Sequence, residues 1–146
     1  MKNAKLLIPC IALLVVPLTS CDLFEKAGDI HDYVATYTLE AAYERTYHVY
    51  WGSEKLTSEK ELSGIPKKIV ILETKKVTYW DDEGNEKTGK VKCMEKYCRF
   101  YSLPFSSSYK FDKRYDNSLS YSYESTHMSV EYDVTHRHIL YRRADS

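Results

Sequence analysis

The sequence predicts a mainly β protein, a small antiparallel barrel or sandwich of about six to eight strands that forms one domain over residues 32–143. Three observations support this fold class. The chain has 14 tyrosines together with many Val, Ile and Thr residues, the types favoured on pleated, half-buried surfaces. Apolar and polar residues alternate in several segments, which is the period of a strand. Turn-forming residues separate these segments.

The alternating segments place apolar side chains on one face of each predicted strand. The sets with this period are Tyr47, Val49 and Trp51; Val77 and Tyr79; Leu119, Tyr121 and Tyr123; and Met128, Val130, Tyr132 and Val134. The segment "KKIVILE", residues 67–73, is apolar on both faces and is the best candidate for a central strand.

The turns predict two hairpins. "DDEGNE", residues 81–86, joins Val77–Trp80 to Lys87–Met94. "ESTH", residues 124–127, joins "SLSYSY" to "MSVEYDV", and the apolar positions change there from odd to even numbers. "LPFSSS", residues 103–108, interrupts the alternation and is expected to be a loop.

Residues 38–50 fit two periods. Good helix formers in "LEAAYER" have helical spacing, yet the same stretch also alternates as a strand. We expect one strand near residues 33–38 and another over residues 45–51, with a bend or short helix between them. The polar segment that follows, residues 52–64, is expected to be a loop or an edge hairpin.

The N-terminus has the layout of a secretory signal peptide. Lys2 and Lys5 precede an apolar run of thirteen residues, Leu6–Leu18, and two small polar residues follow it. A helix that spans a bilayer needs about 20 apolar residues, so this run is too short for a permanent span.

The four residues Leu18-Thr19-Ser20-Cys21 resemble the lipobox of bacterial lipoproteins, and the resemblance covers about the first 21 residues. It implies that a signal peptide, residues 1–20, is removed and that Cys21 receives a diacylglyceryl group on sulfur and an acyl group on its new amine. Two or three acyl chains give stable membrane attachment, whereas one does not. Residues 21–31 would then be the lipidated N-terminus and a tether. The alternative is an uncleaved apolar helix with a chance cysteine.

The expected compartment and the net charge of the mature chain limit the kinds of partner that we expect. In enteric Gram-negative lipoproteins an aspartate after the cysteine is associated with the inner membrane, so Asp22 favours its periplasmic face; the outer membrane is the alternative. Without Lys2 and Lys5 the mature chain has 19 basic and 21 acidic residues, a formal net charge of −2. This balance gives no basic excess for nucleic acid. We expect a membrane contact through the lipid and an envelope protein as partner.

Cys93 and Cys98 are expected to pair in a disulfide, because an exported protein meets an oxidising compartment. On one continuous strand they would lie about 16 Å apart, so pairing requires that the chain turn between them. The prediction is a short hairpin clamped by a disulfide that contributes on the order of 2 kcal/mol. "MEKY" contains no usual turn residue, so two separate reduced cysteines remain the alternative.

No motif points to catalysis, a metal or another cofactor. His136 and His138 share one face of a predicted strand, and His127 lies across the adjacent turn. Three imidazoles could bind a transition metal, but no complete ligand set has a defined spacing, and surface histidines are the simpler interpretation. The chain also lacks a Gly-x-Ser-x-Gly elbow and a glycine-rich phosphate loop.

Tyrosine, serine, asparagine and aspartate are concentrated in residues 106–125, a mixture typical of recognition surfaces. The candidate binding residues there are Tyr109, Tyr115, Tyr121 and Tyr123. We therefore expect a non-catalytic envelope lipoprotein that binds another protein, of an assembly, inhibitor, immunity or exclusion type. The alternative is a lipocalin-like carrier of a small apolar ligand, which needs an open interior; the bulky inward candidates favour a filled core.

Overall fold

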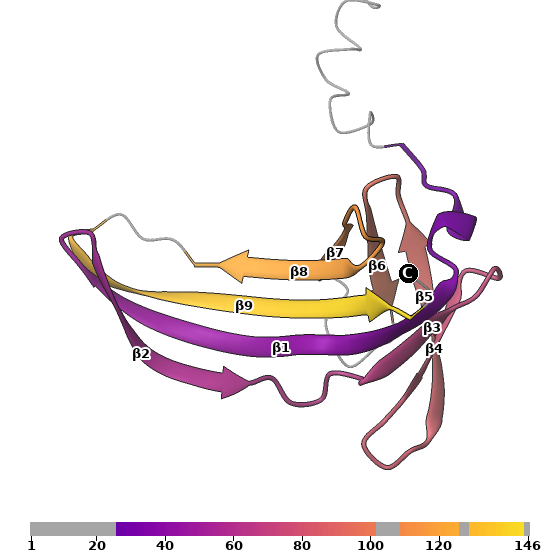
Figure 1. Cartoon of the computed structure of the whole chain (residues 1–146), viewed down its shortest axis with the longest axis horizontal. Helices are drawn as coiled ribbons and strands as arrows, with labels where there is room; N and C mark the ends of the chain where they lie inside the picture. Colours follow the sequence, from indigo (N-terminus) through magenta and orange to yellow (C-terminus); the bar gives the residue numbers. More distant parts are fainter. Residues whose placement is uncertain (1–25, 102–108, 126–128, 145–146) are drawn as a thin grey trace, which may run out of the picture.

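The computed structural model describes residues 26–101, 109–125 and 129–144, which form an antiparallel β barrel (Figure 1). Eight strands close into a ring in the order β1-β3-β4-β5-β6-β7-β8-β9, with β9 pairing back to β1. The predicted antiparallel fold is confirmed, and of the two predicted architectures the barrel is present. The strands are β1 Ala35–Tyr50, β2 Ser53–Glu61, β3 Lys68–Ile71, β4 Lys76–Trp80, β5 Glu86–Cys93, β6 Tyr97–Tyr101, β7 Lys110–Lys113, β8 Leu119–Glu124 and β9 Glu131–Arg143.

Strand β1 is a single long strand that pairs with three others. One edge bonds to β9 from Tyr37 to Tyr50. The other edge bonds first to β3, over Ala35–Thr38, and then to β2, over Tyr43–Tyr50. The register shifts between Leu39 and Ala41, where a β-bulge lies. The predicted short helix and the division into two strands are therefore wrong, because paired edges keep this stretch extended despite its helix formers, and the bulge supplies the local bend.

The strand β2 is the ninth strand and is attached to β1 by one edge, which confirms the edge-hairpin alternative for residues 52–64. Because β1 and β9 are longer than the other barrel strands, they continue beyond the barrel with β2 and the end of β8. We call this four-stranded ribbon the extension: residues 43–50 of β1, β2, residues 122–124 of β8 and residues 131–138 of β9. Figure 1 shows it curving away from the barrel on the left.

Both predicted hairpins involve strands that do pair. The β4–β5 hairpin is confirmed, and the side chain of Asp81 accepts hydrogen bonds from the backbone N–H groups of Glu83 and Asn85 in its turn. Strands β8 and β9 also pair, but Glu124 lies opposite His136, so the register expected from a tight turn at residues 124–127 is wrong. Residues 131–135 of β9 pair with β1 alone, and pairing with β8 begins at His136. Residues 126–128 and the predicted loop at 103–108 lie outside the described residues.

Aromatic side chains fill the barrel. The buried cluster comprises Tyr33, Tyr37, Ile69, Ile71, Val77, Tyr79, Val91, Cys98, Phe100, Phe111, Leu119, Tyr121, Ile139 and Tyr141. The hydroxyls of Tyr33, Tyr37 and Tyr141 donate hydrogen bonds of 2.6–2.7 Å to backbone carbonyls, so burial leaves them satisfied. Burial raises the pKa of Tyr33 and Tyr141. An eight-stranded barrel is just wide enough for such side chains.

The two described cysteines lie directly opposite each other across the β5–β6 hairpin, so the predicted turn between them is confirmed. Both thiols are free in the structure, which therefore does not show the predicted disulfide. Cys98 is fully buried in the core and Cys93 packs against it. Burial raises the pKa of the Cys93 thiol to about 12 and that of Cys98 well above its usual value. Because the thiolate is the reactive form, these residues act as small apolar core side chains.

The chain before β1 is docked on the barrel. Ala27 forms an antiparallel bridge with Met94, the N–H of Gly28 donates to the carbonyl of Cys93, and the N–H of Glu95 donates to the carbonyl of Lys26. A 3-10 helix, Ile30–Asp32, follows and is capped by Asp29. Of residues 26–31, assigned to the tether from the sequence, 26–28 thus contact the β5–β6 hairpin and Ile30 packs against the core. The remaining tether residues, 21–25, lie outside the described residues.

Gly28 is required for this docking, because a Cβ atom there would lie 2.2 Å from the carbonyl oxygen of Met94. Gly28→Ala is expected to displace the segment and to lower the free energy of unfolding by about 1–3 kcal/mol. Urea unfolding and hydrogen exchange of the amides of residues 26–34 measure the two effects. Ala27→Ser, an exposed change on the same segment, is the control; equal protection in both variants would contradict the prediction.

Candidate functional site

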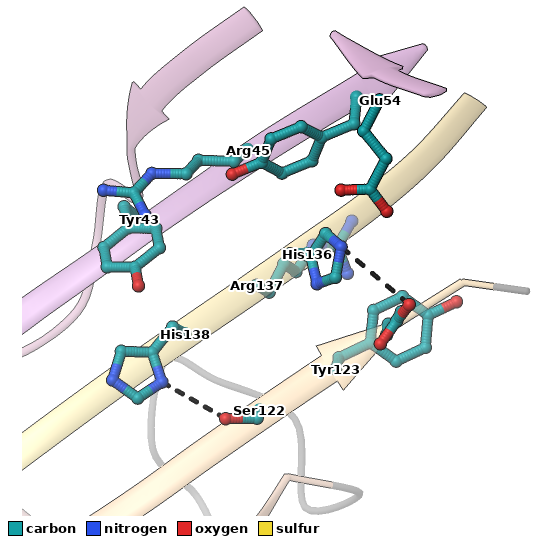
Figure 2. A pocket seen from close by; sticks show the side chains of 10 residues that line it. Tyr43, Arg45, Glu54, Ser122, Tyr123, His136, Arg137 and His138 are labelled. Atoms are coloured by element: carbon teal, nitrogen blue, oxygen red, sulfur yellow. Dashed lines mark hydrogen bonds and ion pairs between the residues drawn. The ribbon is translucent and has the colours of Figure 1, made fainter. Parts of the chain in front are cut away.

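The outer face of the extension carries an open groove of about 580 Å³. Cross-strand register builds it: Tyr43 lies opposite His138, and Arg45 lies opposite His136. Ser122 and Glu124 of β8 continue these two rows, and Glu54 of β2 closes one side (Figure 2). We call this the outer groove; its lining residues are Tyr43, Arg45, Tyr47, Glu54, Ser122, Tyr123, Glu124, His136, Arg137 and His138.

Contacts between neighbouring side chains hold the groove in shape. The Tyr43 and His138 rings have centroids 5.4 Å apart, and Tyr47 meets His136 edge-on at 5.3 Å. The guanidinium of Arg45 lies 4.1 Å from the centroid of the Tyr43 ring and donates a 2.7 Å hydrogen bond to Glu59. The groove therefore presents aromatic, cationic and anionic groups whose positions are already fixed before any ligand binds.

The far end of the extension, the distal tip, exposes large apolar side chains. It consists of Tyr50, Trp51 and Val130, all more than half exposed, and Trp51 is 71% exposed. The N–H of Trp51 donates a 3.0 Å hydrogen bond to the carbonyl of Val130, which joins the β1–β2 turn to the residues before β9. The Trp51 ring meets that of Tyr50 edge-on. A cluster of this kind is unusual on a surface that contacts only water.

Trp51 has a backbone conformation that bulky residues avoid. Its φ is 49°, and that of Gly52 is 77°, so both residues of the two-residue turn are left-handed. Such turns prefer Asn-Gly or Asp-Gly, because a side chain with φ above zero is strained. The sequence pattern placed Trp51 on a strand and gave no weight to "YWG" as a turn. The aromatic residue directly before a glycine is the signal that could have located the tip.

The inner face of the extension, which continues the barrel's core face, is polar. Glu44, with only 14% of its side chain exposed, is bonded to Arg137 and lies 3.3 Å from Lys60, and Arg137 holds the pKa of the Glu44 carboxyl below its usual range. Farther out, the imidazole of His48 lies between Asp133 and Glu131, at 2.9 and 3.0 Å. Charged pairs thus cover the mouth of the barrel where the hydrophobic core ends.

The four candidate tyrosines do not form one surface. Tyr121 is buried in the core, and Tyr109 stacks on it with centroids 4.3 Å apart. Tyr123 is exposed and lies opposite Arg137 on the face that continues the core, where both residues border the outer groove. Tyr115 is fully exposed in the β7–β8 turn, at the opposite end of the molecule from the distal tip.

The histidines were correctly placed on one face of β9, where they line the groove. His138 lies 3.2 Å from the hydroxyl of Ser122, and His136 lies 3.9 Å from Glu124. His127 is outside the described residues. Within the described ranges no group of three or more His, Cys, Asp or Glu side chains is placed to hold a metal ion.

Replacing Trp51 tests whether its backbone conformation is strained. Trp51→Asn is expected to raise the free energy of unfolding by about 0.5–1 kcal/mol, because asparagine tolerates φ above zero and the indole makes few contacts. Urea unfolding measures the change. Tyr50→Asn, at a strand position next to the turn, is the control and is not expected to stabilise; a destabilised Trp51→Asn variant would disprove the strain argument.

Two histidines are expected to give opposite pH dependences. Hydrogen bonding to Asp133 and Glu131 raises the pKa of His48, so its stabilising contribution is complete below the unfolded value of about 6.5 and is lost as the pH rises through the folded pKa. Burial, aided by the charge of Arg114, lowers the pKa of His138, so its protonation disfavours folding as the pH falls below about 6.5.

Thermal unfolding of His48→Gln and His138→Gln, each compared with the unmodified chain between about pH 5 and pH 9, measures these contributions. His48→Gln is expected to lose most stability at the acid end, whereas His138→Gln is expected to resist acid better than the unmodified chain. The same sign of pH dependence in both variants would contradict the assigned contacts.

No protein-family model matches the chain, and comparison with curated proteins and with solved structures finds no similar protein. In the part of the chain that the structure describes, no helix has the length and apolar character needed to cross a membrane.

Proposed function

We propose that this protein is a lipid-anchored component of the bacterial envelope that has no catalytic role and binds another envelope protein through the distal tip and the adjoining outer groove. The observation that carries the proposal is Trp51, an exposed indole held in a strained backbone conformation. Strained backbone conformations of this kind cluster at functional sites such as ligand-binding surfaces.

The composition of the tip and groove suits a protein partner. Tryptophan, tyrosine and arginine are the residues that most often dominate the binding energy of protein interfaces. The tip offers Tyr50 and Trp51, and the groove offers Tyr43, Tyr47 and Arg45. Most of these side chains contact one another, so binding would immobilise few additional rotamers.

The filled interior supports an external binding site over the carrier alternative. A carrier needs an interior cavity, whereas the described core is occupied by seven buried tyrosine and phenylalanine side chains: Tyr33, Tyr37, Tyr79, Phe100, Phe111, Tyr121 and Tyr141. Native mass spectrometry of protein extracted from membranes would reveal a retained apolar ligand. Such a ligand would support the carrier alternative.

The anchor is supported by the sequence alone. The signal-peptide layout and Leu18-Thr19-Ser20-Cys21 fall outside the described residues. Asp22 favours the periplasmic face of the inner membrane, with the outer membrane as the alternative. The partner would then be an envelope protein of the assembly, inhibitor, immunity or exclusion type.

Substitution of the lipidated residue tests the anchor. Cys21→Ser is expected to leave the protein unlipidated, so that it is released from membranes or remains as an uncleaved precursor. Membrane fractionation with mass spectrometry of the N-terminus measures both results. Mature, membrane-bound Cys21→Ser protein would refute the anchor.

Binding is tested by substitutions at the two ends of the molecule. Envelope proteins that co-purify with the anchored protein are identified by mass spectrometry and then purified for binding measurements. Trp51→Asn is expected to weaken binding at least about tenfold, the effect of losing a tryptophan hot spot, without loss of stability. Tyr115→Asn, which removes a fully exposed tyrosine far from the tip, is the matched control. Equal binding by both variants would disprove the assignment of the tip.

A further inference from the structure

We propose that the barrel stands end-on to its membrane, with the end opposite the distal tip in contact with the lipid headgroups. We call this the proximal end: the docked segment Lys26–Val34 and the turns β3–β4, β5–β6 and β7–β8 (residues 72–75, 94–96 and 114–118). Figure 1 shows the docked segment and the β1–β2 turn at opposite ends of the molecule. The inference rests on the lipid anchor proposed at Cys21.

The short tether keeps the barrel close to the membrane. The described chain begins at Lys26, which is already bonded to the β5–β6 turn through Glu95. Four residues, 22–25, separate Lys26 from Cys21. Five Cα–Cα steps reach at most about 18 Å when fully extended. Lys26, which is bonded to the β5–β6 turn, must therefore lie within this distance of the lipidated residue.

The docked segment is fixed to the barrel at several points, so it restricts orientation as well as distance. Besides the bridge between Ala27 and Met94, the hydroxyl of Tyr33 donates a 2.6 Å hydrogen bond to the carbonyl of Met94. At its other end Arg143 donates to the carbonyls of Asp32 and Val34. A segment held along its length transmits the position of the anchor to the whole barrel.

The surface of the proximal end suits a headgroup layer. Leu72 and Tyr115 are exposed on two of its turns. Exposed Lys75, Lys96 and Arg114 accompany them, one on each turn. Glu73, Glu95 and Asp116 lie on the same turns, and Asp116 is paired with Arg142 at 3.2 Å. Tyrosine and long basic side chains are the groups that favour the boundary between apolar membrane and water.

This orientation directs the distal tip away from the membrane. Strand β1 runs from the proximal end to the tip over 16 residues, about 50 Å at 3.3 Å per residue. The polar headgroup layer on one side of a bilayer is only about 5–8 Å thick. A partner protein would therefore meet Trp51 well outside the lipid.

Fluorescence quenching in vesicles tests the orientation. The lipidated protein carries a fluorophore on a cysteine introduced by Tyr115→Cys at the proximal end or Lys55→Cys on β2, both exposed positions. Vesicles contain phosphatidylethanolamine with about one quarter phosphatidylglycerol and a headgroup-level spin-labelled lipid as quencher. We expect loss of fluorescence at position 115 and none at position 55. A second pair, Lys96→Cys at the proximal end and Ser53→Cys at the start of β2, shows whether the result depends on the labelled position.

The outcomes separate this inference from the anchor. Equal quenching at both ends, or quenching at the distal positions alone, would overturn the end-on orientation while leaving the anchor intact. Absence of lipid on Cys21 in the same preparation would overturn both. The labelled Cys21→Ser chain, mixed with the same vesicles, is expected to show no quenching at either end; quenching at position 115 in that variant would show that the tether does not set the orientation.

Discussion

The pairing of β1 with β9 is the constraint on which the rest of the structure depends. It joins the first strand to the last and converts an eight-stranded meander into a closed barrel. Closure removes the two sheet edges that the meander would otherwise expose and encloses the aromatic core. Because the closing contact links residues about a hundred positions apart, its loop-closure entropy must be overcome before the core forms, which is expected to make folding slow.

The same two strands create the extension, because they continue after their barrel neighbours have ended. Along the inner face of β9, Tyr141 and Ile139 belong to the core, and Arg137 and Asp133 follow at the same period. The change from apolar to charged residues occurs where the barrel wall becomes an open ribbon. Ion pairs with Glu44 and His48 compensate the charges there. The outer face is left free to carry a groove and a tip.

The sequence predicted the fold class and the β4–β5 hairpin, because alternation and turn chemistry are local signals. The turn between Cys93 and Cys98 was predicted only as a requirement of the expected disulfide, since "MEKY" contains no usual turn residue. It did not predict that β1 is one strand. Local helix propensity around Ala41 suggested a break there, and paired edges, which are not local, override that propensity. The disulfide was expected from the compartment alone and is not shown by the structure, and the burial of Cys98 could not be predicted because it depends on the closed core.

The candidate site was predictable only in part. The shared face of His136 and His138 followed from their spacing. The four tyrosines were grouped by proximity in the sequence, but strand β8 carries Tyr121 into the core while the β7–β8 turn carries Tyr115 to the far end. Trp51 was missed because its role depends on a φ value that strand periodicity does not reveal.

Strand β2 has a consequence for how neighbouring copies would interact if the proposed anchor holds them on one membrane. The lipid anchor proposed at Cys21 would confine the molecules to two dimensions and raise the frequency of their encounters. Along β2 every residue is exposed, and Glu54, Lys55, Glu59, Lys60 and Glu61 make the strand highly charged. Such charges discourage a free strand edge from pairing with a neighbouring copy. Crowded copies would thus remain separate molecules, each with its own tip available.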